Sequence, residues 1–109
     1  MVKGFEQHCP VARTLDVIGE KWTILILRDL LVEGPRKFQD FERSLPGIAP
    51  TTLSARLKGL KANGIIDSRL YSDHPPRPEY FLTGKGKTLG SILAALRDWG
   101  RAHTAAPKR

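Results

Sequence analysis

The amino-acid sequence predicts a mainly α-helical domain with one small β-hairpin. Apolar residues recur at helical spacing along five segments, and the segment 21–32 is apolar nearly all the way round. Between residues 66 and 83 the period changes to alternation, which is typical of strands. A length of 109 residues suffices for one modest core, so we expect a single domain over residues 1–109 with a loose tail at 104–109.

Three helices are expected in the first half of the chain. The first covers residues 9–19, with a proline at its start and a glycine at its end. The second covers residues 21–32, and its all-round apolar surface indicates that it lies in the middle of the domain with Trp22 in the core. Gly34-Pro35 then breaks the chain, and a third helix is expected over residues 37–45.

A fourth helix is expected from Pro50 to Gly64, after the break at Pro46-Gly47. Its inward face consists of leucines at i, i+4 and i+7, namely Leu53, Leu57 and Leu60. The opposite face carries short side chains, one central cation and no carboxylate: Thr51, Ala55, Lys58 and Ala62. Two helices joined by a short turn that contains glycine form a helix-turn-helix unit.

The outer face of this fourth helix is a candidate DNA-reading surface. Thr52 and Ser54 flank the face, and Arg56 lies nearer its border with the core. Short side chains let a helix approach base edges, while cations at the margins reach phosphates. The alternative is an ordinary amphipathic helix whose outer face is solvated.

A β-hairpin is expected after the fourth helix, with strands at 66–71 and 79–83 joined by the proline-rich loop 72–78. A helix-turn-helix unit followed by such a hairpin makes a winged helix. We expect His74 and Arg77 at the tip, within reach of phosphate or the minor groove. The candidate phosphate-contacting cations of the whole chain are Arg56, Lys58, Arg69 and Arg77. The alternative for the hairpin is a solvated loop with no role in binding.

A last helix is expected from a cap at Thr83 to about His103. It carries a continuous apolar stripe at helical spacing: Leu89, Ile92, Leu93, Leu96 and Trp99. Four helices and a hairpin are too few to cover the whole stripe, which favours a homodimer with the stripe at its interface. The alternative is that the stripe packs on its own domain.

The charge of the chain favours a polyanionic partner. Lys and Arg number 18 against 11 Asp and Glu, which gives a formal net charge of +7 and a pI near 10.0. Such a balance suits nucleic acid or an anionic membrane surface. No apolar run approaches the roughly 18 residues of a membrane span. The first residues lack the apolar core of a signal peptide, so a cytoplasmic location is expected.

No catalytic or metal-binding pattern appears. The sequence lacks a Ser/His/Asp or Cys/His set, a phosphate-binding loop and clustered metal ligands, so we expect no enzyme, metal or cofactor. RNA binding is disfavoured because stacking aromatics are missing from the polar faces. Double-stranded DNA is therefore the expected partner. The alternative is a basic protein that binds nucleic acid non-specifically or lies on a membrane surface.

Several motifs then carry a family resemblance. The segments CPVARTLDVIGEKWTILILRDLLVEGPRKFQDFERSLPGI, LSARLKGLKANGII, YSDHPPRPEYFLTGKG and LRDWG resemble the HxlR-type bacterial transcriptional regulators from about Cys9 to Gly100. The resemblance implies a homodimeric winged helix-turn-helix protein whose first and last helices build the dimer interface. It also implies an inverted-repeat operator. One departure is Ala49, where family members often carry Ser, so the side-chain cap of the fourth helix is missing.

Cys9 is a candidate redox sensor. Some members of the family sense electrophiles or oxidants through a cysteine beside the first helix, and Cys9 matches that position. The positive end of a helix dipole favours the reactive thiolate. With one cysteine per chain, a disulfide forms only between subunits or with a small thiol. The alternative is a small hydrophobic residue packed in the dimer interface. The identity of any effector stays open.

Overall fold

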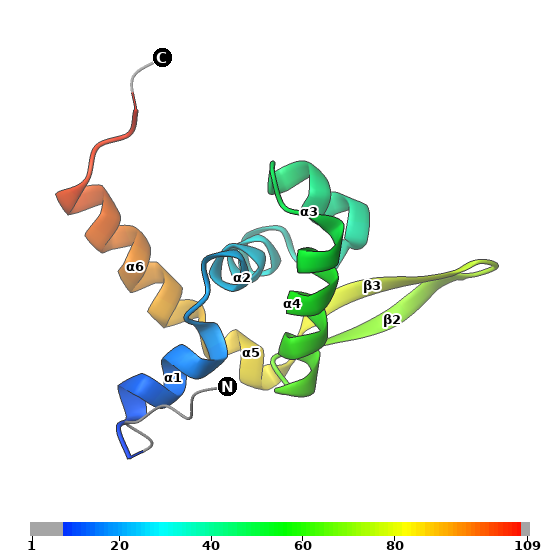
Figure 1. The fold of residues 1–109 in the computed structure, drawn as a ribbon, viewed down its shortest axis with the longest axis horizontal. Helices are drawn as coiled ribbons and strands as arrows, with labels where there is room; N and C mark the ends of the chain where they lie inside the picture. Colours follow the sequence, from blue (N-terminus) through cyan, green and yellow to red (C-terminus); the bar gives the residue numbers. More distant parts are fainter. Residues whose placement is uncertain (1–7, 108–109) are drawn as a thin grey trace.

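The computed structural model describes residues 8–107, which form six helices and a three-stranded sheet around a central helix (Figure 1). The helices are α1 Pro10–Ile18, α2 Lys21–Glu33, α3 Phe38–Ser44, α4 Pro50–Ala62, α5 Gly84–Lys87 and α6 Gly90–His103. The strands are β1 Arg36–Lys37, β2 Ile66–Asp73 and β3 Pro76–Leu82. α2 packs against α1, α3, α4 and α6 and against β1 and β3, so its predicted central position is confirmed. Residues 104–107 form no helix or strand, and the rest of the predicted tail lies outside the described residues.

The hydrophobic core lies where α2, α3 and α4 meet the base of the hairpin. Its fully buried side chains come from all of these elements: Ile26, Leu27, Phe41, Leu53, Leu57, Leu60 and Ile66. The predicted inward face of α4 is thereby confirmed. Trp22 is half-buried and packs against this cluster. The core therefore fixes α4 to α2 and leaves its opposite face to solvent.

The sheet is antiparallel with strand order β1-β3-β2, and β1 was not expected from the sequence. The hairpin is longer than predicted, because its strands extend to Asp73 and Pro76 and leave only a two-residue turn. β1 reaches along β3 only to Glu79. The prolines nearer the tip thus have one neighbouring strand, and their missing N–H groups lose no bond to β1. Arg77 consequently lies within β3, opposite Ser72, and the prediction that it sits at the tip is wrong.

The predicted last helix is two helices. The Thr83 hydroxyl accepts a hydrogen bond from the backbone N–H of Gly86 at 3.1 Å, so it caps the short helix α5 and not the long one. The chain turns at Thr88-Leu89, and α6 begins at Gly90. Figure 1 shows α6 leaving the body of the molecule beside α1, at the end opposite the hairpin.

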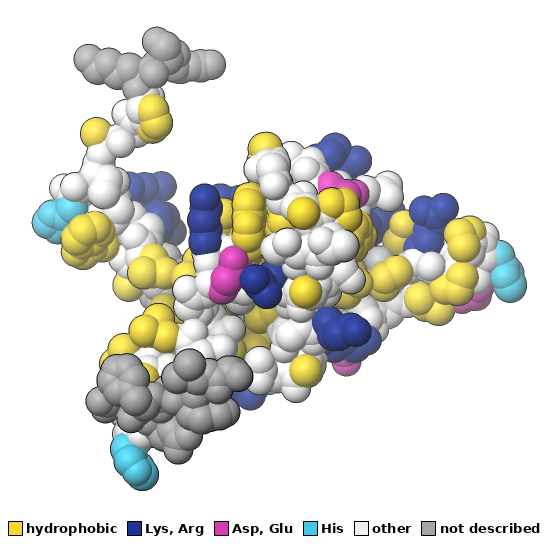
Figure 2. All heavy atoms as spheres, viewed as in Figure 1, with side chains coloured by type: hydrophobic (Ala, Val, Ile, Leu, Met, Phe, Trp, Pro, Cys, Tyr) yellow, Lys and Arg dark blue, Asp and Glu magenta, His cyan; other side chains and the backbone are white. Residues whose placement is uncertain are grey.

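α1 and α6 expose apolar side chains that the single chain does not cover. In α6, Leu89 and Leu93 pack against the domain's own core, so the predicted stripe is divided. The uncovered side chains are Val11 and Leu15 on α1 and Ile92, Leu96 and Trp99 on α6. Figure 2 shows hydrophobic side chains exposed on α6 and on the visible surface between α6 and α1. We call these five residues the apolar face.

Candidate DNA interface

The turn before α4 places this helix against α3 as a helix-turn-helix unit. Gly47 has φ +92°, a left-handed conformation that suits glycine, and Ile48 N–H donates to the carbonyl of Leu45 at 3.1 Å. Pro50 is the first helical residue, and Ala49 makes no side-chain cap, as predicted. The N-terminus of α4 is therefore positioned by the turn and by proline geometry, without a side-chain cap.

The outer face of α4 is open to solvent. Thr51, Ser54, Ala55 and Lys58 are exposed, and Thr52 is half-buried. No residue in the described part of the chain forms an ion pair with Lys58. The helix thus presents short side chains and one unpaired cation, which is the surface that the sequence predicted. Its two long edges differ in what they face.

One edge of α4 faces the hairpin. Together they line a shallow groove formed by Ser54, Leu57, Lys58, Lys61, Ser68, Pro78 and Tyr80. Lys61 Nζ donates to Ser68 Oγ at 2.9 Å and lies 3.9 Å from Asp67 Oδ1. Burial raises the pKa of Tyr80, whose ring also packs near Phe41. This edge ties the hairpin, which we call the wing, to α4.

The predicted cations of the wing lie in two different environments. Arg77 and the turn residue His74 are exposed, and among residues 8–107 neither has an ion-pair partner. Arg69 instead lies 3.2 Å from Glu79 and stacks on the ring of Phe81 at 4.9 Å. Because residues alternate along a strand, Arg69 lies on the face of the wing opposite Ser68 and the α4 groove. By the same alternation Arg77 lies on that face as well, and it is more available to an outside anion than Arg69 because no carboxylate within residues 8–107 pairs with it.

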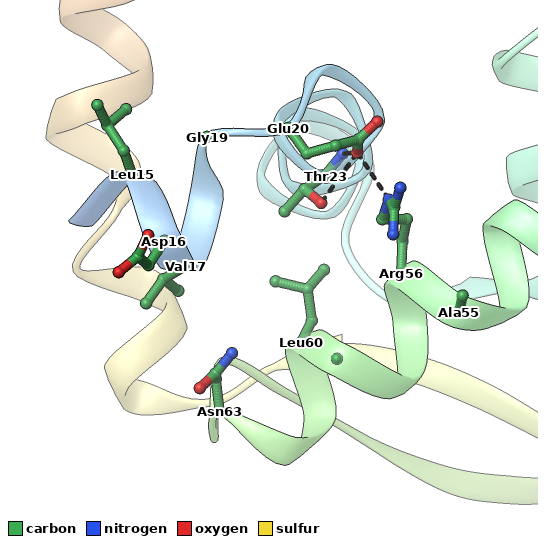
Figure 3. Close-up of a pocket in the computed structure, with 11 residues that line it drawn as sticks. Leu15, Asp16, Val17, Gly19, Glu20, Thr23, Ala55, Arg56, Leu60 and Asn63 are labelled. Carbon is green, nitrogen blue, oxygen red and sulfur yellow. Dashed lines mark hydrogen bonds and ion pairs between the residues drawn. The ribbon is translucent and has the colours of Figure 1, made fainter. Parts of the chain in front are cut away.

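The other edge of α4 faces the start of α2, where Arg56 meets Glu20 (Figure 3). Arg56 Nε lies 2.9 Å from Glu20 Oε1. The same carboxylate oxygen accepts the backbone N–H of Thr23 at 3.0 Å and thereby caps α2. Burial opposes ionisation of Glu20, but the N–H groups of Thr23 and Trp22 and the charge of Arg56 outweigh it and lower the pKa of Glu20. In the sequence, Glu20 stands out only as a possible helix start.

A second polar contact that the sequence does not reveal joins α2 to α3. Asp29 is buried, and its carboxylate accepts hydrogen bonds from the Ser44 hydroxyl and from the Arg28 guanidinium, the latter at 2.9 Å. The available signal was a carboxylate in the middle of a helix whose apolar residues go nearly all the way round. This contact anchors the end of α3, directly before the turn that leads into α4.

The remaining candidate residues lie away from α4. Cys9 is the N-cap residue of α1, half-buried and without a disulfide. No group of three or more His, Cys, Asp or Glu residues that could hold a metal ion occurs between residues 8 and 107. In the same part of the chain no helix has the length and apolarity needed to cross a bilayer.

A helix-turn-helix unit with an open, basic second helix and an adjoining wing defines the class of DNA-binding transcription regulators. The chain belongs to the HxlR-like helix-turn-helix family, whose pattern it matches over residues 17–108. The predicted winged helix-turn-helix fold is thereby confirmed, and the family consists of transcriptional regulators and not of enzymes.

Known relatives agree with this placement. The HTH-type transcriptional regulator YybR of Bacillus subtilis is 37% identical over 98 residues, which are 90% of this chain and 78% of that protein. The redox regulator HypR in its oxidized form has a TM-score of 0.81 and 37% identity, over 90% of this chain and all of that one. Its reduced form has a TM-score of 0.80 and 37% identity, over 86% and 92% of the two chains.

Proposed function

We propose that this protein is a homodimeric regulator that binds an inverted-repeat operator in double-stranded DNA. The observation that carries the proposal is the outer face of α4, which is exposed, free of carboxylates and flanked by the wing. Thr51, Thr52, Ser54 and Ala55 contact base edges, since their short side chains let the helix enter a major groove. Lys58 and Arg77 contact phosphates on either side of that groove.

The apolar face supplies the second half of the proposal. Isolated exposed apolar residues are ordinary, but several large ones on two helices at the same end of the molecule are typical of a surface that another chain covers. A two-fold axis through α1 and α6 leaves both wings at the far ends of the dimer, because each wing lies opposite its own apolar face. The two α4 helices then read half-sites on one side of the duplex.

The proposal includes redox control of DNA binding through Cys9. The similar structure of HypR, which is named a redox regulator, supports this part. The thiol lies at the start of α1, the helix that carries Val11 and Leu15 of the apolar face. Oxidation of Cys9, by a disulfide with the partner chain or with a small thiol, would alter that interface and hence the spacing of the two α4 helices. Treatment with diamide should change DNA binding by the wild type and leave Cys9→Ser unaffected. Equal responses of both proteins would limit Cys9 to a packing role.

The first experiment distinguishes DNA binding from binding to an anionic membrane surface, which a basic protein could also favour. Purified protein is titrated into a labelled random duplex at low salt, and in parallel it is sedimented with anionic phospholipid vesicles. We expect retardation of the duplex and no pelleting with vesicles. Genomic DNA fragments that co-purify with the protein should then displace the labelled random duplex at a lower concentration than unlabelled random duplex does. Pelleting without retardation would contradict the proposed function.

A further inference from the structure

Each edge of the outer face of α4 carries one cation held by a carboxylate. On the wing edge Lys61 lies 3.9 Å from Asp67, and on the α2 edge Arg56 lies 2.9 Å from Glu20. The two pairs differ in kind. Lys61 also donates a hydrogen bond to Ser68, whereas the buried Nε of Arg56 has no well-aligned hydrogen-bond acceptor among the described residues. The Arg56–Glu20 contact is therefore a close ion pair at hydrogen-bond distance but with poor alignment at Nε, and the guanidinium lowers the pKa of the Glu20 carboxyl.

Glu20 is the fixed member of this pair. Its carboxylate is tied to the first turn of α2 by the N–H and the hydroxyl of Thr23, at 3.0 and 3.2 Å. Its lowered pKa keeps it ionised near neutral pH. The Arg56 side chain is long and 38% exposed, and no second carboxylate within residues 8–107 pairs with it. The pair thus joins a carboxylate fixed to α2 with a long, part-exposed arginine side chain that reaches it from α4 (Figure 3).

We propose that Glu20 is a positioning residue that withholds Arg56 from DNA and so limits the affinity of the α4 surface. The inference rests on the proposed function, in which the outer face of α4 meets a duplex. A phosphate that approaches this edge competes with a carboxylate already 2.9 Å from Nε. Arg56 hence contributes less counterion release than the unpaired Lys58 on the same helix. The pair is part-exposed, which sets the expected effect at roughly two- to fivefold in affinity.

The test measures binding of a labelled random duplex over a series of KCl concentrations. Glu20→Gln keeps an oxygen that caps Thr23 and removes the charge. We expect it to bind roughly two- to fivefold more tightly than wild type at low salt. The slope of log affinity against log salt should become steeper by about 0.9, because one further cation is released to phosphate. Adding Arg56→Ala to Glu20→Gln should abolish both the tighter binding and the steeper slope.

Asp98→Asn is the matched control. It makes the same change in net charge and also frees an arginine, since Asp98 lies 3.0 Å from Arg97. That pair is on α6, away from α4 (Figure 1), so the salt slope should equal that of wild type. Glu20→Ser, which places a preferred N-cap residue before α2, repeats the test in a second background. Thermal unfolding of each variant reports whether the fold is kept.

The outcomes distinguish the inference from the function on which it rests. A wild-type protein that binds no duplex at low salt overturns the proposed function and the inference with it. Wild-type binding together with an unchanged or weakened affinity in folded Glu20→Gln or Glu20→Ser overturns the inference alone. A gain in Asp98→Asn as large as that in Glu20→Gln assigns the effect to net charge and also overturns it.

Discussion

Gly86 lies directly against the backbone carbonyl of Ile65, so that a Cβ built on Gly86 would stand 2.1 Å from that oxygen. Ile65 is the last of the three residues between the end of α4 and the start of β2, and Gly86 belongs to α5, which follows β3. Lys85 Nζ adds a hydrogen bond to the carbonyl of Asn63 at 2.9 Å. α5 therefore holds the end of α4 against the base of the wing.

Gly86→Ala should destabilise the fold by about 1–3 kcal/mol, because the new methyl group meets backbone, which yields less easily than a side-chain end. Urea unfolding followed by circular dichroism measures this change. The control is Gly59→Ala on α4, where a Cβ meets nothing within 4 Å and helix propensity should add about 1 kcal/mol of stability. Equal stability of the two variants would contradict the close packing of α5.

Ser44→Ala should lower the free energy of unfolding by about 1–3 kcal/mol, because the buried carboxylate of Asp29 loses its partner on α3. Removing one partner of a buried pair leaves the other group desolvated and unsatisfied. Chemical denaturation measures the change, with the exposed residue Ser91 mutated to alanine as control. A Ser44→Ala protein as stable as the control would show that the contact adds nothing to the α2–α3 junction.

The sequence was sufficient to predict most of the fold. Leucines spaced at i, i+4 and i+7 identify the buried side of α4, and Gly64 ends that helix region with φ +72°. β1 was missed because two residues carry no periodic signal, and its existence depends on pairing with Tyr80 far along the chain. The division of the last helix was missed for a similar reason, since it depends on the contact of Gly86 with Ile65.

The candidate site was predicted in outline, but its ion pairs were not. The exposed face of α4 follows from helical periodicity, since the buried leucines determine which side is left open. Arg56 and Arg69 look equivalent to Lys58 in the sequence, yet each lies beside a carboxylate in the fold. Glu20 is 36 positions from Arg56, and only the packing of α2 on α4 brings the two together. Long-range pairing of charges leaves no local pattern to read.

Leu96→Glu should convert the proposed dimer into a monomer. Leu96 is 49% exposed in the single chain and lies at the middle of the α6 part of the apolar face, so a charge there would be buried unpaired by a partner. Light scattering at micromolar concentration measures the mass. Ser91→Glu adds the same charge to an exposed position off the stripe and should stay dimeric. A wild-type protein of single-chain mass that still binds its operator tightly would contradict dimerisation.

Arg77→Ala and Lys58→Ala should each weaken binding to operator DNA and to random duplex by about the same factor. Each should also reduce the slope of log affinity against log salt by about 0.9, because each removes one phosphate contact. Arg101→Ala on α6 is the control and should keep the wild-type slope. If Arg77 enters the minor groove, the affinity lost in Arg77→Ala should instead depend on the A·T content at the edges of the site. Unchanged affinities and slopes in Arg77→Ala would remove the wing from the interface.

The central claim is that two α4 helices, related by a two-fold axis, read the DNA. Selection of bound fragments from a library of random duplexes tests this most directly, because the selection itself reveals the operator sequence. The account predicts an inverted repeat whose half-site centres lie one helical turn apart or a multiple of it, about 34–36 Å per turn. It also predicts that Thr51→Ala and Ala55→Ser change the preferred bases within the half-sites and leave their spacing unaltered. A single asymmetric motif, or no enriched motif despite tight binding, would contradict it.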